Sequence, residues 1–261
     1  MNVAIVQNHP VFGDLRGNAE RLLAMIESEK ADLYILPELA FSGYQFLSKA
    51  EARSLAETVD GPTVGLFRKA ARDKNACIVF GFPEISDGEL YNSSLAVLPD
   101  GSDCLYRKTH LFYKETLWFK PGTTGFPIFE FLGTRVGMAI CFDWFFPESF
   151  RTLALGGADI IAHCSNLVMP YCQHADYAAA VQNRVYIATA NRVGVESREP
   201  ESLTFTGGSV LVSPRGEYLL TAPTDRETIL VARVDPELAR SKRINAINDV
   251  FAERKPEHYR L

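Results

Sequence analysis

The sequence passes twice through the same order of apolar strands and amphipathic helices, and this repetition limits the fold more than any other feature. The first half predicts a strand at 2–7, a helix at 15–30, a strand at 33–36, a helix from 62, a strand at 76–80 and a hairpin at 94–107. The second half predicts a strand at 135–140, a helix at 147–156, a strand at 160–163, a helix at 175–185, a strand at 186–190 and a hairpin at 209–220. This order predicts an α/β fold in which two similar sheets, each covered by helices on its outer face, stack as a four-layer α-β-β-α sandwich.

Short echoes in the residues support the repeat. Ala-Asp precedes an apolar strand at 31–32 and again at 158–159, and the pattern S-x-x-V-x-P-x-G occurs at 94–101 and 209–216. Turn chemistry alone favours Pro-x-Gly, so the shared order of elements is the stronger argument.

The chain divides into one domain and a C-terminal tail. We expect a single domain over residues 1–240 and a tail at 241–261, which contains a charged stretch interrupted by apolar side chains such as Ile244, Ile247 and Tyr259. Either the tail is a solvated terminus, or these side chains pack across a second subunit.

Composition excludes several classes of protein. The 261 residues are 47% hydrophobic, which suffices for a full core, and the net charge of −5 is scattered, so neither nucleic acid nor a membrane surface is expected as a partner. A strand begins directly after Met1, without the basic region of a signal peptide, and no apolar run reaches the roughly 18 residues of a membrane span. The five cysteines follow no disulfide pattern, so we expect a cytoplasmic protein.

Cys141 is the first candidate for chemistry. It ends the strand at 135–140 and precedes an aromatic loop and a helix opened by Pro147. Amide dipoles at a helix start are expected to lower the pKa of the thiol and expose the sulfur, as a nucleophile requires. The N–H of Phe142 would then be a donor to an oxyanion, and Asp143 a helix cap or a residue that orients the loop. The alternative is that Cys141 is one more small buried hydrophobe.

Three charged residues are further candidates, and two of them lie where strands end. Glu38 follows Pro37 at the end of the strand at 33–36, and desolvation there would raise its pKa toward the range of a general base. Lys108 lies where the first hairpin enters an aromatic loop, and it could place a positive charge beside an oxyanion. Glu115 lies among aromatic residues and needs a partner, for which Lys108 is nearest. For each residue the alternative is an exposed loop position.

A metal site is not expected. His163, Cys164, Cys172 and His174 are potential ligands, but their spacing does not match a zinc motif, and His163 and Cys164 should point to opposite faces of a strand. The sequence also lacks a glycine-rich phosphate loop and the motifs of zinc proteases and serine hydrolases. Asn166 follows the strand and either lines a pocket or satisfies local backbone groups.

These motifs, taken together and in this order, resemble the signature of the nitrilase superfamily of carbon-nitrogen hydrolases. The resemblance rests on Glu38 in LPELAFSGY, Lys108 in YRKTHLF, Glu115 in KETLWFKPG and Cys141 in GMAICFDWFFPE, and it extends over nearly the whole chain. It implies an α-β-β-α sandwich, a homodimer or higher homo-oligomer, a Glu-Lys-Cys triad with a second supporting Glu, and no metal or organic cofactor. One departure is Gln182, where relatives usually carry Glu.

The resemblance also implies roles for the individual residues. Cys141 is the nucleophile, and Glu38 is the base that takes its proton and later activates water. Lys108 and the Phe142 amide stabilise the oxyanion, while Glu115 positions Lys108 and the substrate. A thioester on Cys141 then forms and is hydrolysed.

The substrate expected from the resemblance is a small linear amide, hydrolysed to a carboxylic acid and ammonia. Phe142 and Asp143 after the cysteine resemble the amidase and carbamoylase branches more than the dedicated nitrilases, which tend to have Trp and Glu there. A small acyl pocket would be formed by Tyr44, Tyr113, Phe119, Phe142, Trp144 and Asn166. The alternatives are an N-carbamoyl amidohydrolase, an aliphatic nitrilase and, from another class, a non-catalytic redox or binding protein.

Overall fold

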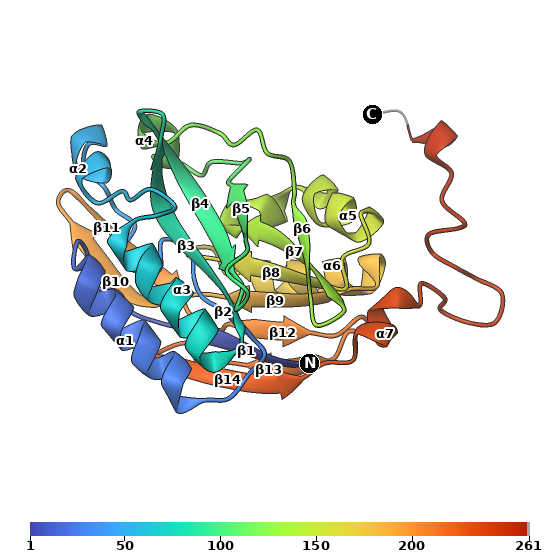
Figure 1. Cartoon of the computed structure of the whole chain (residues 1–261). Coiled ribbons are helices and arrows are strands. Elements are labelled where there is room, and N and C mark those ends of the chain that lie inside the picture. Colours follow the sequence, from blue (N-terminus) through green and yellow to red (C-terminus); the bar gives the residue numbers. More distant parts are fainter. Residues whose placement is uncertain (260–261) are drawn as a thin grey trace.

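Two six-stranded sheets face each other and carry helices on their outer sides in the computed structural model, which describes residues 1–259 (Figure 1). The first sheet has the order β14 (Thr228–Arg233), β1 (Asn2–Gln7), β2 (Leu33–Ile35), β3 (Cys77–Ser86), β4 (Glu89–Val97) and β5 (Asp103–Arg107). The second has the order β6 (Ile128–Phe131), β7 (Thr134–Ile140), β8 (Ile160–Cys164), β9 (Tyr186–Ala190), β12 (Val210–Val212) and β13 (Tyr218–Thr221). The predicted α-β-β-α sandwich is confirmed.

The repeat is visible in the strand directions. Three parallel strands lie in the middle of each sheet, β1-β2-β3 in the first and β7-β8-β9 in the second. An antiparallel hairpin follows on one side, and one antiparallel strand, β14 or β6, closes the other edge. Strand β14 comes from the end of the chain and pairs with β1, so the first sheet needs chain from both halves.

Helices cover the outer faces because each has one apolar side. The first sheet is covered by α1 (Leu15–Ser28) and α3 (Pro62–Lys74), which bury Leu22, Ile26, Val64 and Phe67 among others. The second sheet is covered by α5 (Pro147–Leu155) and α6 (Cys172–Asn183). The remaining helices are short: α2 (Lys49–Ser54), α4 (Glu115–Trp118), α7 (Pro236–Arg240) and the 3-10 helices η1 (Cys141–Phe145) and η2 (Pro256–His258).

The main core lies between the sheets and fixes where the strands end. Alternate residues of both sheets, among them Ile35, Val79, Met138 and Ile140, pack into it. Because β7, β8 and β9 are parallel and in register, Ile140 lies beside Cys164, which lies beside Ala190. The residues that follow these strands therefore meet at one edge.

Several elements were missed or misplaced. The strand predicted at 76–80 continues to Ser86 and turns at Asp87 and Gly88 into β4, which begins well before residue 94. The hairpin of β10 (Val193–Arg198) and β11 (Glu201–Thr206) was not predicted, because exposed and polar positions interrupt its apolar pattern. The sequence suggests a short helix at about 236–243, and the observed helix α7 ends earlier, at Arg240.

After α7 the tail runs over the outer side of the second half (Figure 1), where Lys242 donates to the carbonyl oxygens of Asn183 and Arg184 and Phe251 packs against the outer core cluster. Side chains of Ile244 and Ile247 are 58% and 87% exposed. The last two residues of the predicted tail, Arg260 and Leu261, lie outside the described part of the chain. Among the helices of residues 1–259, none is both long and apolar enough to cross a membrane.

Candidate active site

Four predicted site residues meet in the interior, although they come from four different segments. Glu38 follows β2, Lys108 follows β5, Glu115 begins α4 and Cys141 follows β7. All four are buried. Because the two sheets pack face to face, the segments after β2 and β7 come together. The segment after β5 supplies the ammonium group of Lys108.

Lys108 lies between two carboxylates. Its Nζ atom is 2.6 Å from Oε1 of Glu38 and 2.8 Å from Oε2 of Glu115. Burial by itself lowers the pKa of the ammonium, but the charges of Glu115 and Glu38 outweigh burial and raise the pKa above its ordinary value. Lys108 is therefore a fixed positive charge and not a proton acceptor at neutral pH.

Glu38 has the properties of a general base. Burial raises its pKa to about 7, with Lys108 opposing the rise and Glu115 adding to it. One oxygen, Oε1, accepts hydrogen bonds from Lys108 and from Nδ2 of Asn92 at 2.7 Å. The other oxygen, Oε2, is buried and has no hydrogen-bond partner within the described chain. The carboxylate is thus held at one oxygen while the second is free to receive a proton.

Glu115 is held from three directions. Besides Lys108, it accepts a hydrogen bond from the hydroxyl of Tyr44 at 2.6 Å and one from the N–H of Phe112 at 3.2 Å. Tyr44 was predicted to line the acyl pocket, and the structure places its hydroxyl on Glu115 instead of leaving it free. These contacts fix Glu115 and, through it, the position of the Lys108 ammonium.

The pKa of Cys141 differs from the sequence prediction. Burial raises the pKa of the thiol well above its usual value, Glu38 raises it further and Lys108 opposes both. The expectation that a helix start would lower this pKa and expose the sulfur is wrong, because Cys141 is 6% exposed and desolvation disfavours the thiolate. The thiol therefore needs a base to become nucleophilic. Its Sγ atom lies 3.7 Å from the carbonyl oxygen of Asn166.

Asp143 links the segment after Cys141 to the other half of the molecule. Its carboxylate accepts hydrogen bonds from the N–H of Ile140 at 2.9 Å and from the hydroxyl of Tyr106 at 2.7 Å. It also lies 2.8 Å from Nδ1 of His110. Asp143 thus orients the loop, because Tyr106 and His110 flank Lys108 in the chain. It does not cap the helix that Pro147 opens, since the N-cap of α5 is Phe146 and no side chain caps it.

A small pocket adjoins the sulfur. It is lined by Phe112, Cys141, Phe142, Trp144, Asn166, Leu167, Val168 and Met169. The side-chain amide of Asn166 is buried, and neither its oxygen nor its nitrogen has a hydrogen-bond partner among residues 1–259. This amide is available to a ligand in the pocket.

The other residues predicted for the acyl pocket lie elsewhere. Tyr44 and Tyr113 line a neighbouring pocket that also includes Glu115, and Tyr113 is 56% exposed with its hydroxyl 3.1 Å from Glu201. Phe119 packs against Phe46 in a separate apolar cluster. Tyr113 and Phe119 lie close to Glu115 along the chain, which is why the sequence suggested them. The backbone turns at Tyr113, and its ring is exposed on the surface.

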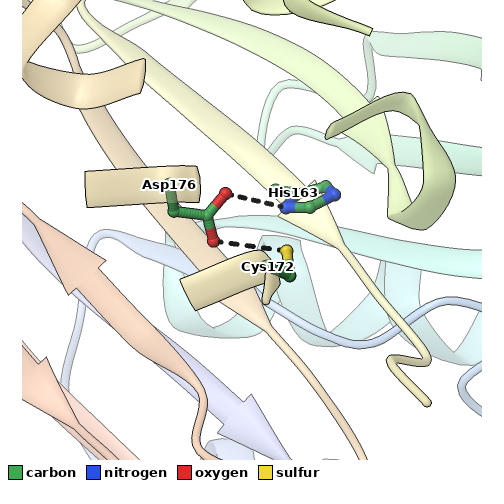
Figure 2. A group of neighbouring side chains, drawn as sticks. All are labelled: His163, Cys172 and Asp176. Atoms are coloured by element: carbon green, nitrogen blue, oxygen red, sulfur yellow. Dashed lines mark hydrogen bonds and ion pairs between the residues drawn. The ribbon is translucent and has the colours of Figure 1, made fainter. Parts of the chain in front are cut away.

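A buried polar group contacts the backbone of Cys141, and it includes two of the potential ligands named from the sequence and one residue, Asp176, that was not foreseen. It consists of His163, Cys172 and Asp176, whose potential ligand atoms lie within 4.8 Å of one another (Figure 2). Cys164 points instead between the sheets, where it contacts Ser94. Burial raises the pKa of Cys172 well above its usual value, which disfavours the thiolate that a metal would need.

Comparison with known proteins adds a family and several relatives. Residues 2–244 match the family described as carbon-nitrogen hydrolase. A nitrilase of Pyrococcus abyssi is 44% identical over 99% of both chains, and an (R)-stereoselective amidase of a Pseudomonas species is 35% identical over 86% of this chain and 82% of its own. A crystal structure of a CN-hydrolase superfamily protein from Xanthomonas campestris, with an arsenic adduct in its active site, matches with a TM-score of 0.83 and 26% identity over 93% of both chains.

Proposed function

Because the chain belongs to the carbon-nitrogen hydrolase family, we propose that it hydrolyses a small linear amide to a carboxylic acid and ammonia through a thioester on Cys141. The observation that carries this proposal is the position of Lys108 between Glu38 and Glu115 beside a protonated buried thiol. This arrangement combines a base, a cation and a nucleophile in a site with little water.

The first half of the reaction forms the thioester. The Cys141 sulfur attacks the carbonyl carbon while its proton moves to the free oxygen of Glu38. Negative charge develops on the carbonyl oxygen, where the Lys108 ammonium and the Phe142 N–H stabilise it. When the tetrahedral intermediate collapses, the carbon-nitrogen bond breaks, and the proton on Glu38 passes to the departing nitrogen, which leaves as ammonia.

The second half uses the same groups in reverse. Glu38 takes a proton from a water molecule, and the resulting hydroxide adds to the thioester carbon. The second tetrahedral intermediate collapses with cleavage of the carbon-sulfur bond, and the proton returns to the sulfur of Cys141. A pKa of about 7 suits Glu38 for both directions of proton transfer at neutral pH.

The pocket favours a short acyl group. The pocket is small, and its walls are mainly apolar and aromatic. At the pocket wall, Asn166 offers an NH2 donor group and an oxygen acceptor. Its oxygen suits the NH2 group of an amide substrate, which donates hydrogen bonds. The second candidate is an N-carbamoyl compound, whose carbonyl carbon carries two nitrogens instead of one. The third is a nitrile, because one relative is named a nitrilase.

Ammonia release from matched compounds tests the proposed function. We expect primary amides of three to five carbons to react faster than the N-carbamoyl compounds and nitriles of the same chain length, since their acyl groups fit the pocket. Carbon dioxide together with ammonia would identify the carbamoyl reaction instead. Absence of ammonia from every member of the panel would contradict the proposed function.

We also propose that the chain forms a homodimer or higher homo-oligomer in which residues 241–259 pack across a second copy. Ile244 and Ile247 extend from the body and are largely exposed in the single chain. Isolated exposed apolar residues are common, but two on one extended tail favour contact with another surface. Residues 1–240 would then form the catalytic domain, and the tail would contribute to assembly.

Substitution of both tail isoleucines tests this assembly. The double variant Ile244→Asp with Ile247→Asp is expected to have a lower molar mass in solution than the unchanged chain, because two charges would be buried at the contact. Light scattering after gel filtration measures the mass. Leu66→Asp, a partly exposed position on α3, serves as the control and should leave the mass unchanged. An unchanged mass in the double variant would exclude the tail from the interface.

A further inference from the structure

His163 contacts the backbone of Cys141 and is not among the residues that line the pocket beside the sulfur. Its Nε2 atom is 2.9 Å from the carbonyl oxygen of Cys141, and the imidazole is fully buried beside the ring of Phe150. A carbonyl oxygen only accepts hydrogen bonds, so Nε2 carries a hydrogen and donates it. The hydroxyl of Ser165 lies 3.1 Å from the same nitrogen and shares this donor as an acceptor.

The backbone of Cys141 makes this contact important for the next residue. Cys141 has φ of 38°, in the left-handed region that a non-glycine residue adopts only when its surroundings hold it there. The peptide unit that joins Cys141 to Phe142 is planar, so its C=O and N–H point in opposite directions. Holding the carbonyl toward His163 therefore turns the Phe142 N–H away from His163. This N–H lies in the first turn of η1, where N–H groups lack an acceptor within the helix.

A chain of hydrogen bonds fixes the imidazole. Its Nδ1 atom is 3.0 Å from the hydroxyl of Thr189, which donates to Oδ2 of Asp176 at 2.7 Å. Figure 2 shows Asp176 with one carboxylate oxygen toward His163 and the other toward Cys172, whose sulfur is 3.6 Å away. Every member of this group is buried, so the ring has no room to turn.

The N–H at Nε2 of His163 donates to the Cys141 carbonyl whether the proton shared with Asp176 lies on the imidazole or on the carboxylate. When Thr189 donates to Asp176, Nδ1 carries a hydrogen and donates to Thr189. When Asp176 carries the proton and donates to Thr189, the hydroxyl hydrogen turns to Nδ1. In both arrangements Nε2 keeps its hydrogen, and the contact with the Cys141 carbonyl persists.

We propose that His163, fixed by Thr189 and Asp176, is a positioning residue that aims the Phe142 N–H at the developing oxyanion by holding the Cys141 carbonyl. The inference rests on the proposed function, in which this N–H stabilises negative charge on the substrate carbonyl. His163 does not touch the substrate and takes no proton from it. Its effect is confined to steps in which an oxyanion forms.

Two reactions of Cys141 separate this role from general damage to the site. In the addition of butanal, the thiol proton moves to Glu38 while a bond forms between sulfur and the carbonyl carbon, and the electron pair of the C=O bond goes to the oxygen, which takes the oxyanion position. In alkylation by iodoacetamide, the thiol proton likewise moves to Glu38, a sulfur-carbon bond forms with loss of iodide, and no oxyanion donor is needed. Mass spectrometry measures alkylation, and protection by butanal gives the Kd of the aldehyde without any requirement for turnover.

The variant His163→Leu removes the donor, and His163→Gln restores an N–H near the position of Nε2. In His163→Leu we expect kcat to fall about 10- to 100-fold and the Kd of butanal to rise by a similar factor, while KM and the alkylation rate change less than about threefold. His163→Gln should recover most of both losses. Ser94→Ala is the control. It removes a buried hydroxyl that contacts Cys164 on the other face of β8, and it should leave kcat, KM, the Kd of butanal and the alkylation rate unchanged.

Two results would overturn the proposal: unchanged kcat and butanal affinity in His163→Leu, or an alkylation rate that falls as far as kcat does. If His163→Leu does not fold, Thr189→Val, which keeps the shape of the side chain but removes the partner of Nδ1, is judged by the same criteria. If the unchanged protein releases no ammonia, the proposed function fails, and the Kd of butanal alone decides the role of His163.

Discussion

Cys141→Ala is expected to lower kcat for amide hydrolysis by a factor of about 10⁴ to 10⁶, as removal of a covalent nucleophile does in other hydrolases. Alanine cannot form the thioester, but it leaves the contacts among Glu38, Lys108 and Glu115 in place. The loss should therefore be one of chemistry and not of folding. Ammonia release measures kcat, and the melting temperature measures folding.

A second cysteine provides the matched control. Cys104→Ala, at a half-buried position on β5, should retain the activity of the unchanged protein. Intact mass after brief reaction with substrate should show an acyl group on the unchanged chain and none on Cys141→Ala. If Cys141→Ala kept more than about 1% of kcat, the nucleophile assignment would be lost, and Glu38 would have to activate water directly.

The order of elements could be predicted because most central strands are continuous apolar runs between turn residues. The strand at 160–163 and the strand at 186–190 lie in the structure almost where their composition predicts. The hairpin of β10 and β11 could not be predicted in the same way, since its residues are partly exposed. The pairing of β14 with β1 joins positions more than two hundred residues apart, and no local pattern indicates it.

The candidate site was predictable to the extent that it depends on the ends of elements. Cys141 directly follows β7 and Glu38 lies just beyond the end of β2, so stacked sheets bring them to one edge. The pKa of Cys141 was not predictable, because its direction depends on burial by residues far away in the chain. Asn92 donates a hydrogen bond to Glu38, but it precedes the hairpin predicted at 94–107 and was not identified as a site residue. Two adjacent polar residues, Asn92 and Ser93, in an otherwise apolar stretch are nevertheless a signal that the sequence contains.

His163 shows a different limit of the sequence. In the sequence it is only a potential metal ligand, and its spacing to the other potential ligands does not match a zinc motif. Its contact with the Cys141 carbonyl depends on the left-handed backbone of Cys141, which a sequence does not display for a non-glycine residue. Residues that act through the backbone of a nucleophile are therefore found from geometry and not from motifs.

Glu38→Gln is expected to lower kcat by a factor of about 10² to 10⁴ and to change the pH dependence of what remains. Hydrolysis requires the ionised form of Glu38, so kcat/KM of the unchanged protein should rise with pH through the pKa of about 7 and then level off. The thiol must still be protonated before attack, and its raised pKa places any decline at much higher pH. Glutamine cannot accept the proton, so the rise near neutral pH should be absent. Initial rates at constant ionic strength from pH 5 to 9 measure both curves.

Glu57→Gln separates this effect from the loss of any buried carboxylate. Glu57 is buried in the same half of the molecule, where it accepts hydrogen bonds from the N–H and the hydroxyl of Thr63 at the start of α3. Its substitution should lower stability by about 0.5 to 2 kcal/mol, the usual cost of a lost helix cap, and leave the pH profile of kcat/KM unchanged. A Glu38→Gln variant that kept the rise near pH 7 would show that another group is the base. That group could not be Lys108, because Lys108 stays protonated in this pH range.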